Sequence, residues 1–276
     1  MTNTMIANAN KMAEMINARG IKAEIMTKNT NGIEKIGICI GEGNVRPTIY
    51  PRLDMVDDFD KAVDEIISDY EKHKDTDGMF TDIIDNFTDF DFVKGGIIPC
   101  LVAKVTDDIV SRDYLDLKVI YKYVLPNKQT SVTVKPEHLN TWGVAEEELF
   151  NIAKENVKPT FVNKSMMETL SEMSGIPAEV MFPNIIDDPL RVFTTESKLW
   201  GASVLLFPEL FVNMGNDVTI LPSSVHEVIA LPSTENGDDN FFVNMITEVN
   251  QTQVAPEEVL SNHPYYYSNG EIKGAA

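Results

Sequence analysis

The alternation of apolar and polar positions predicts a three-stranded antiparallel meander near the N-terminus. Residues 21–25 alternate apolar and charged side chains, the period of a half-buried strand. The turn-forming residues 29–32 then lead into an apolar run at 33–40, and a third short run follows at 45–50. Pro47 places this last strand at a sheet edge or at a bulge, because proline cannot donate a ladder hydrogen bond.

Two helices are predicted beside this meander. Residues 5–18 form a short helix that ends before Gly20. Residues 54–73 form the clearest helix of the chain, because apolar side chains recur on one face and carboxylates fill the other. The apolar face consists of Met55, Phe59, Ala62, Val63, Ile66, Ile67 and Tyr70.

The rest of the chain alternates between predicted strands and predicted helices. The strands are expected at 97–105, 115–125, 130–134, 191–195, 202–207, 217–222 and 225–232, with a further strand around 265–272. The helices are expected at 145–157, 164–173, 208–214 and 239–250. The pattern changes at Pro136, so we predict an N-terminal lobe at 1–135 and a C-terminal lobe at 136–276. The fold class is α+β, with an antiparallel meander and helices in the first lobe and a mixed α/β second lobe.

Composition and charge narrow the functional classes. The 276 residues include 43 acidic and 23 basic side chains, a net charge of −20. Such a field opposes direct binding to nucleic acid and favours a basic protein partner, although it also serves solubility alone. The first residues resemble no signal peptide, and no apolar stretch reaches the roughly 18 residues that span a bilayer. We therefore expect a cytoplasmic protein that does not enter membranes.

Half of the excess negative charge lies between residues 51 and 91, which hold 14 carboxylates and four basic residues. On the predicted helix, Asp57, Asp60 and Asp64 recur at i, i+3 and i+7 and so form a row. This row is the predicted partner-binding site, because it resembles a phosphate backbone in charge. The alternative is an ordinary solvated helix face.

A second candidate site lies at Ser224, His226 and Glu227, where a serine, a histidine and a carboxylate come close in sequence. The pair His226-Glu227 starts like a zinc-binding motif, but Ala230 stands where the second histidine would be. Neighbouring residues of a strand also point to opposite faces, which separates a nucleophile from its base. If the chain is an enzyme, its catalytic residues therefore remain unknown.

No cofactor or metal is expected. Cys39 and Cys100 each lie in an apolar run and are interpreted as buried free thiols. Asp116 and Lys118, with acidic residues upstream, share a pattern with metal-dependent nucleases, but an exposed strand face explains them more readily.

Several segments together resemble a family of unknown function from gut anaerobic bacteria and their mobile elements. These segments are residues 28–32, 47–50, 200–202, 221–229 and 248–261. The resemblance covers nearly the whole chain and implies a bacterial cytoplasmic protein, with carriage by a phage or a conjugative element as one origin. It supplies no catalytic residues.

The leading hypothesis is a non-enzymatic acidic interaction protein of bacterial or mobile-element origin. Its sharpest form is a nucleic-acid-mimicking inhibitor of a basic protein. The alternative is an enzyme of unknown reaction, with a pocket near the strand that carries Ser224, His226 and Glu227.

Overall fold

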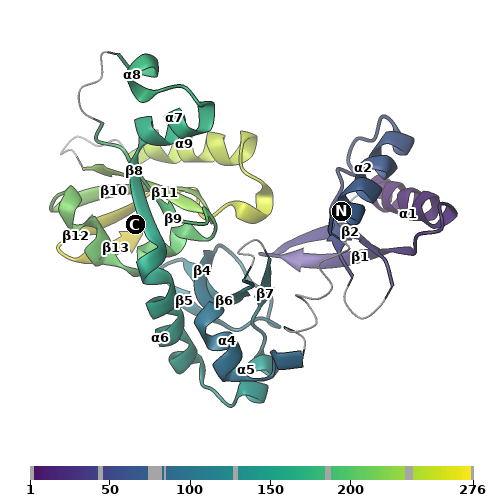
Figure 1. Cartoon of the computed structure of the whole chain (residues 1–276). Helices are drawn as coiled ribbons and strands as arrows, with labels where there is room; N and C mark the ends of the chain where they lie inside the picture. Colours follow the sequence, from purple (N-terminus) through teal and green to yellow (C-terminus); the bar gives the residue numbers. More distant parts are fainter. Residues whose placement is uncertain are drawn as a thin grey trace. The chain divides into compact units, whose positions relative to one another are not determined.

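The computed structural model divides the chain into two compact units, Met1–Thr88 and Asp89–Ala276. The structure describes residues 3–42, 46–73, 83, 85–126, 130–183, 188–233 and 239–274. Helices and antiparallel sheets occur in both units (Figure 1), so the predicted α+β class is confirmed.

The first unit contains the predicted meander. Strands β1 (Ala23–Thr30), β2 (Ile33–Ile40) and β3 (Thr48–Ile49) pair antiparallel in this order. Asn31 and Gly32 form the two-residue turn between β1 and β2 with φ values of 52° and 82°. Left-handed φ at both positions is what a tight hairpin turn requires, and asparagine followed by glycine adopts it most readily.

Two helices cover this sheet. Helix α1 (Asn3–Ala18) packs against β1, β2 and α2 (Phe59–His73). The apolar face of α2 enters the core of the unit as predicted, since Val63 and Ile66 are buried there beside Met12 and Ile38.

Helix α2 begins later than the sequence pattern predicted, and Asp58 explains why. Its side chain accepts the Lys61 N–H (3.1 Å) and its carbonyl accepts the Ala62 N–H (3.1 Å), so Asp58 caps the helix. Asp57 consequently lies before the helix, and the predicted row of three helical carboxylates is wrong at this position.

The second unit holds two antiparallel sheets. The first contains β4 (Ile97–Val102), β6 (Leu117–Val124) and β5 (Ser111–Tyr114) in that order, and β7 (Ser131–Thr133) also pairs with β6. Helix α6 (Glu146–Val157) packs on β4. The short elements around it are α4 (Phe90–Val93), the 3-10 turn η2 (Lys94–Gly96), α5 (Pro136–Trp142) and the 3-10 turn η3 (Lys158–Thr160).

The second sheet has six strands in the order β13-β12-β10-β11-β9-β8. Helix α9 packs against β10, and α7 packs against β8 and β9 (Figure 1). The bounds are β8 (Phe161–Ser165), α7 (Met166–Ser174), α8 (Ala178–Met181), β9 (Arg191–Thr195), β10 (Asp217–Ser224), β11 (Glu227–Pro232), α9 (Asp239–Thr252), η6 (Pro256–Glu258), β12 (Tyr265–Ser268) and β13 (Glu271–Gly274).

The strand predicted at 202–207 is wrong. This segment forms the 3-10 helix η4 (Gly201–Leu206), followed by a second 3-10 helix, η5 (Pro208–Met214). All six residues of η4 are buried. A short, continuously apolar run has no periodicity that separates a buried strand from a buried helix.

The predicted lobe boundary at 135/136 falls inside the second unit, between β7 and α5. Helix α6 follows this point in sequence and packs on β4, which precedes it. Segments on both sides of residue 136 therefore share one core, whereas the two compact units divide at 88/89.

Candidate ligand-binding cavity

A cavity of about 370 Å³ lies in the second unit. Four segments line it: residues 92–98 from α4 to the start of β4, 123–126 at the end of β6, 156–160 at the end of α6 and in η3, and 195–200 from the end of β9 onward. Most of the lining side chains are apolar or aromatic. This volume lies within the range of about 300–1,000 Å³ that is typical of sites for small ligands.

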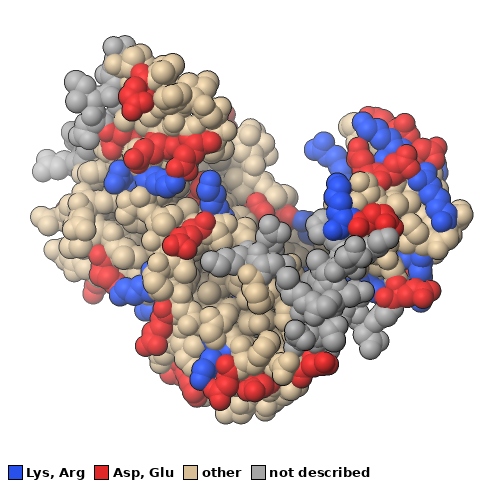
Figure 2. Space-filling model, in the orientation of Figure 1, with Lys and Arg blue, Asp and Glu red and all other residues tan. Residues whose placement is uncertain are grey.

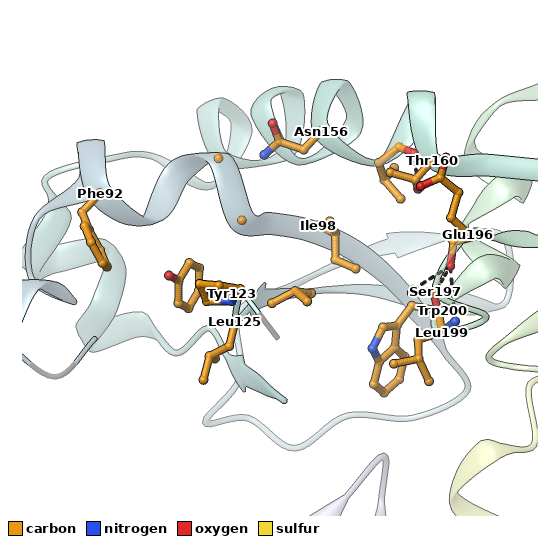
Figure 3. Close-up of a pocket in the computed structure, with 16 residues that line it drawn as sticks. Phe92, Ile98, Tyr123, Leu125, Asn156, Thr160, Glu196, Ser197, Leu199 and Trp200 are labelled. Atoms are coloured by element: carbon orange, nitrogen blue, oxygen red, sulfur yellow. Dashed lines mark hydrogen bonds between the residues drawn. The ribbon is translucent and has the colours of Figure 1, made fainter. Parts of the chain in front are cut away.

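The lining side chains surround an elongated space, with Asn156 and Thr160 along one side and Tyr123 and Trp200 along another (Figure 3). Phe92 and Tyr123 lie towards one end, Leu199 and Trp200 lie towards the other, and Ile98 stands between them. The arrangement suits an elongated apolar group better than a compact one.

Two glycines shape the wall at the start of β4. A Cβ atom at Gly96 would lie 2.7 Å from the Tyr123 ring and 2.9 Å from the Val124 carbonyl oxygen, so β4 can approach the end of β6 this closely only with glycine here. A Cβ atom at Gly95 would meet no atom within 4 Å. A side chain at Gly95 would therefore occupy open space beside the cavity.

Hydrogen bonds hold the wall formed by α6 and η3. The Asn156 amide donates to the Lys94 carbonyl (2.7 Å) and to the Ile97 carbonyl (2.8 Å), and so ties α6 to the start of β4. The Thr160 hydroxyl donates to the Val157 carbonyl at 2.7 Å. The Glu196 N–H donates to the Thr160 carbonyl at 2.9 Å, which joins this wall to the loop after β9.

Trp200 forms the far wall in a conformation that costs free energy. Its φ of 61° is left-handed, and a bulky residue adopts such a value only where its surroundings impose it. Its main-chain N–H donates to Nδ1 of His226 at 3.1 Å, and the two rings lie 5.2 Å apart between centroids. The ammonium of Lys122 lies 4.5 Å from the centroid of the indole ring. These contacts fix Trp200 as a rigid aromatic wall.

The close fit of the next residue also restrains Trp200. A Cβ atom at Gly201 would lie 2.4 Å from the His226 carbonyl oxygen and 2.5 Å from Cα of Thr194. The Gly201 N–H donates to that same carbonyl at 3.0 Å. Backbone contacts on both sides thus leave the chain after Trp200 little room to move.

The structure places His226 in the turn between β10 and β11 rather than on a strand. The Ser224 hydroxyl accepts the main-chain N–H of His226 (3.0 Å), and the Ser223 hydroxyl donates to Glu227 (3.0 Å). Since Nδ1 of His226 accepts the Trp200 N–H, its Nε2 carries the proton and faces Glu258 at 3.4 Å. The three residues of the predicted enzyme site are thus near one another, but their hydrogen bonds hold the turn and the main chain at Trp200. The enzyme hypothesis itself stays a prediction.

The predicted partner-binding carboxylates are only partly available. Asp60 and Asp64 both form ion pairs with Arg19, which directly follows α1, Asp60 at 3.4 Å. Lys and Arg side chains also lie among the acidic ones on the visible face of the first unit (Figure 2). Arg19 was not associated with this row from the sequence, because the contact joins positions 41 and 45 residues apart.

The carboxylates that suggested a nuclease are engaged within the protein. Asp113 pairs with Lys118. The Asp116 carboxylate accepts the Tyr265 hydroxyl (3.0 Å) and lies 2.9 Å from Nε2 of His263. Asp116 therefore links the β5–β6 turn to the six-stranded sheet.

Both cysteines are buried, as predicted. Burial raises the pKa of the Cys100 thiol to about 12, which keeps this thiol protonated and unreactive near neutral pH. Within the described residues, no helix has the length and apolar character needed to cross a membrane.

The fold and the cavity thus define an α+β protein with a preformed apolar site in its second unit. Residues 5–269 match the family of unknown function DUF5688, and the chain belongs to this family. No curated protein and no solved structure matches the chain.

Proposed function

We propose that this chain is a non-enzymatic binding protein whose ligand site is the cavity of the second unit. The main support for this proposal is Trp200, which forms a wall of a preformed apolar cavity and is held in a left-handed backbone conformation that costs free energy. Strained residues that the surrounding structure holds in place concentrate at ligand sites.

The chemistry of the lining supports binding rather than catalysis. Among the lining residues that the structure describes, Glu196 is the only charged side chain, and it is exposed. The Thr160 and Thr195 hydroxyls donate to main-chain carbonyls, at 2.7 Å and 2.8 Å. General acid–base catalysis needs a positioned titratable group within hydrogen-bond reach of the substrate. The described lining offers an exposed carboxylate, Glu196, and the phenol of Tyr123, whose pKa is raised by burial.

The compartment, the origin and a protein partner also belong to the proposal. We propose a cytoplasmic protein of bacterial or mobile-element origin, on the basis of the sequence resemblance. A basic protein partner for Asp57, Asp60 and Asp64, including a target of nucleic-acid mimicry, stays a prediction, and the Arg19 ion pairs weaken the charge available for it.

A substitution at the rim of the cavity tests the proposed function. Gly95 is an exposed lining residue with open space around its Cβ position, so Gly95→Leu adds a side chain at the rim, and Gly95→Ala is the matched control with one added carbon. A library of uncharged and charged apolar fragments is screened by thermal shift on the wild type and on both variants. We expect fragments that stabilise the wild type and Gly95→Ala but not Gly95→Leu. Fragments that stabilise all three proteins equally, or no stabilising fragment at all, would refute the cavity as the binding site.

A further inference from the structure

We propose that the ligand of this cavity is an elongated apolar chain that ends in a cationic amine. This inference rests on the proposed function and adds the shape and the charge of the ligand. An amine of this kind occurs in a free alkyl or arylalkyl amine and in the lysine side chain of a peptide, so the shared chemistry is an apolar stem with a terminal ammonium.

The shape follows from the lining. The lining from Phe92 and Tyr123 to Trp200 exposes apolar surface along its length (Figure 3). If one water-sized group takes about 30 Å³, the 370 Å³ cavity holds on the order of a dozen such groups. An apolar stem of about that many heavy atoms matches both the volume and the arrangement.

The charge follows from Glu196, which lies at the Trp200 end of the cavity and is exposed at the rim. It is accompanied by no lysine or arginine among the described lining residues. A carboxylate at an otherwise uncharged rim attracts an ammonium and repels an acid, and the net charge of −20 acts in the same direction.

Lysines in the lining segments or beside them in sequence contact other groups. Lys94 pairs with Asp91. Lys122 donates to the Thr133 hydroxyl (3.0 Å) and lies over the Trp200 ring. Lys158 pairs with Glu209 at 2.6 Å, and Lys154 lies 4.9 Å from the centroid of the Phe207 ring. The hydrogen bond from Lys164 lowers the pKa of Glu172, desolvation opposes this effect, and Lys198 adds a smaller lowering. None of these contacts involves Glu196.

Trp200 supplies apolar surface at the same end of the cavity. The ammonium of Lys122 already lies 4.5 Å from the centroid of its indole ring, so this ring is engaged with a cation of the protein itself. The indole therefore packs against the apolar stem of the ligand, and Glu196 is the lining group that attracts the amine.

The test uses three probes with the same body and different heads: 4-phenylbutylamine, 4-phenylbutanol and 4-phenylbutyrate. A Trp142→Phe background leaves Trp200 as the single tryptophan, so its fluorescence reports binding in the full-length chain. We expect the amine to bind about fivefold more tightly than the carboxylate at low salt, because Glu196 attracts the ammonium and repels the carboxylate, and each is an exposed interaction of ordinary strength. Glu196→Gln should bring this ratio close to one. Glu271→Gln, which removes an exposed carboxylate outside the lining, should leave it unchanged.

A second arm separates the two sources of the amine. A terminally blocked tetrapeptide with one lysine among leucines is compared with its norleucine analogue in the same assay. Tight binding of the lysine peptide assigns the site to a polypeptide, whereas binding of the free amine alone assigns it to a small molecule. Both results support the inference.

The results that would contradict the inference differ from those that would contradict the proposed function. If 4-phenylbutyrate binds as tightly as the amine, or if Glu196→Gln leaves the preference intact, the inference is wrong while the proposed function survives. If no probe or peptide changes Trp200 fluorescence, and the fragment screen on Gly95→Leu is also negative, the proposed function fails together with the inference.

Discussion

The hydrogen bond from the main-chain N–H of Trp200 to Nδ1 of His226 gives the sharpest structural prediction. His226→Ala removes this acceptor and the ring that lies tilted against the Trp200 indole. A partly buried donor left without a partner costs about 1–2 kcal/mol, and the lost ring contact adds about 0.5–1 kcal/mol. We therefore expect the free energy of unfolding of the second unit to fall by about 2 kcal/mol.

Urea unfolding followed by tryptophan fluorescence measures this loss. Trp142 and Trp200 both lie in the second unit, so the signal reports that unit alone. His226→Asn is the matched variant, because Oδ1 of asparagine can take the place of Nδ1 as the acceptor. It should recover about half of the lost free energy. The reasoning fails if His226→Ala costs less than about 0.5 kcal/mol, or if asparagine is no better than alanine.

Four further predictions concern other parts of the chain. Asp60→Asn with Asp64→Asn should leave the thermal stability of the first unit nearly unchanged, because these ion pairs with Arg19 are exposed; a clear loss in circular dichroism melts would show a structural role. Gly201→Ala should destabilise the second unit by about 2–3 kcal/mol in urea, since its Cβ would meet main-chain atoms of Thr194 and His226; unchanged stability would contradict the close fit. Burial raises the pKa values of Cys100 and Tyr114 to about 12, above their values in the unfolded chain. As the pH rises from about 9 towards 12, the unfolded chain loses these protons before the folded protein does, so the free energy of unfolding should fall. A flat profile of this free energy over the same window would contradict the burial. Ellman's reagent at pH 8 should titrate no thiol in the folded protein and two in urea, and a thiol that reacts before unfolding would contradict the burial of Cys39 or Cys100.

Local chemistry in the sequence was sufficient to predict the first unit. The meander followed from alternating side chains and from the Asn31-Gly32 turn, both of which act over a few residues. The helix boundary was missed because several acidic residues before Phe59 could serve as the cap, and only the structure shows that Asp58 does so.

The second unit was harder to predict where tertiary contacts decide the conformation. Residues 202–207 are predicted as a strand, yet a 3-10 helix forms over Gly201–Leu206, where the main-chain N–H groups of Trp200 and Gly201 both donate to His226. Strands β5 and β8 were not predicted. β5 is short and polar, and β8 lies directly before a helix.

The cavity could not be predicted from the sequence, because four segments spread from residue 92 to residue 200 form it together. Two signals were nevertheless present. The pair Gly95-Gly96 before a buried strand indicates a close backbone approach, and Trp200-Gly201 was noticed only as part of the family resemblance. The acidic row, by contrast, is evident from the sequence, but its partner Arg19 lies in a distant segment, directly after α1.

The central claim is that a ligand enters the cavity beside Trp200, and intermolecular NOEs measure this most directly. The protein is labelled at its methyl groups and at the Trp200 indole in the Trp142→Phe background, and 4-phenylbutylamine is added. The account predicts NOEs from the probe to the Trp200 indole and to the methyl groups of Ile98 and Leu199, and their loss in Gly95→Leu. NOEs confined to residues outside the lining, or the same NOEs in Gly95→Leu, would contradict it.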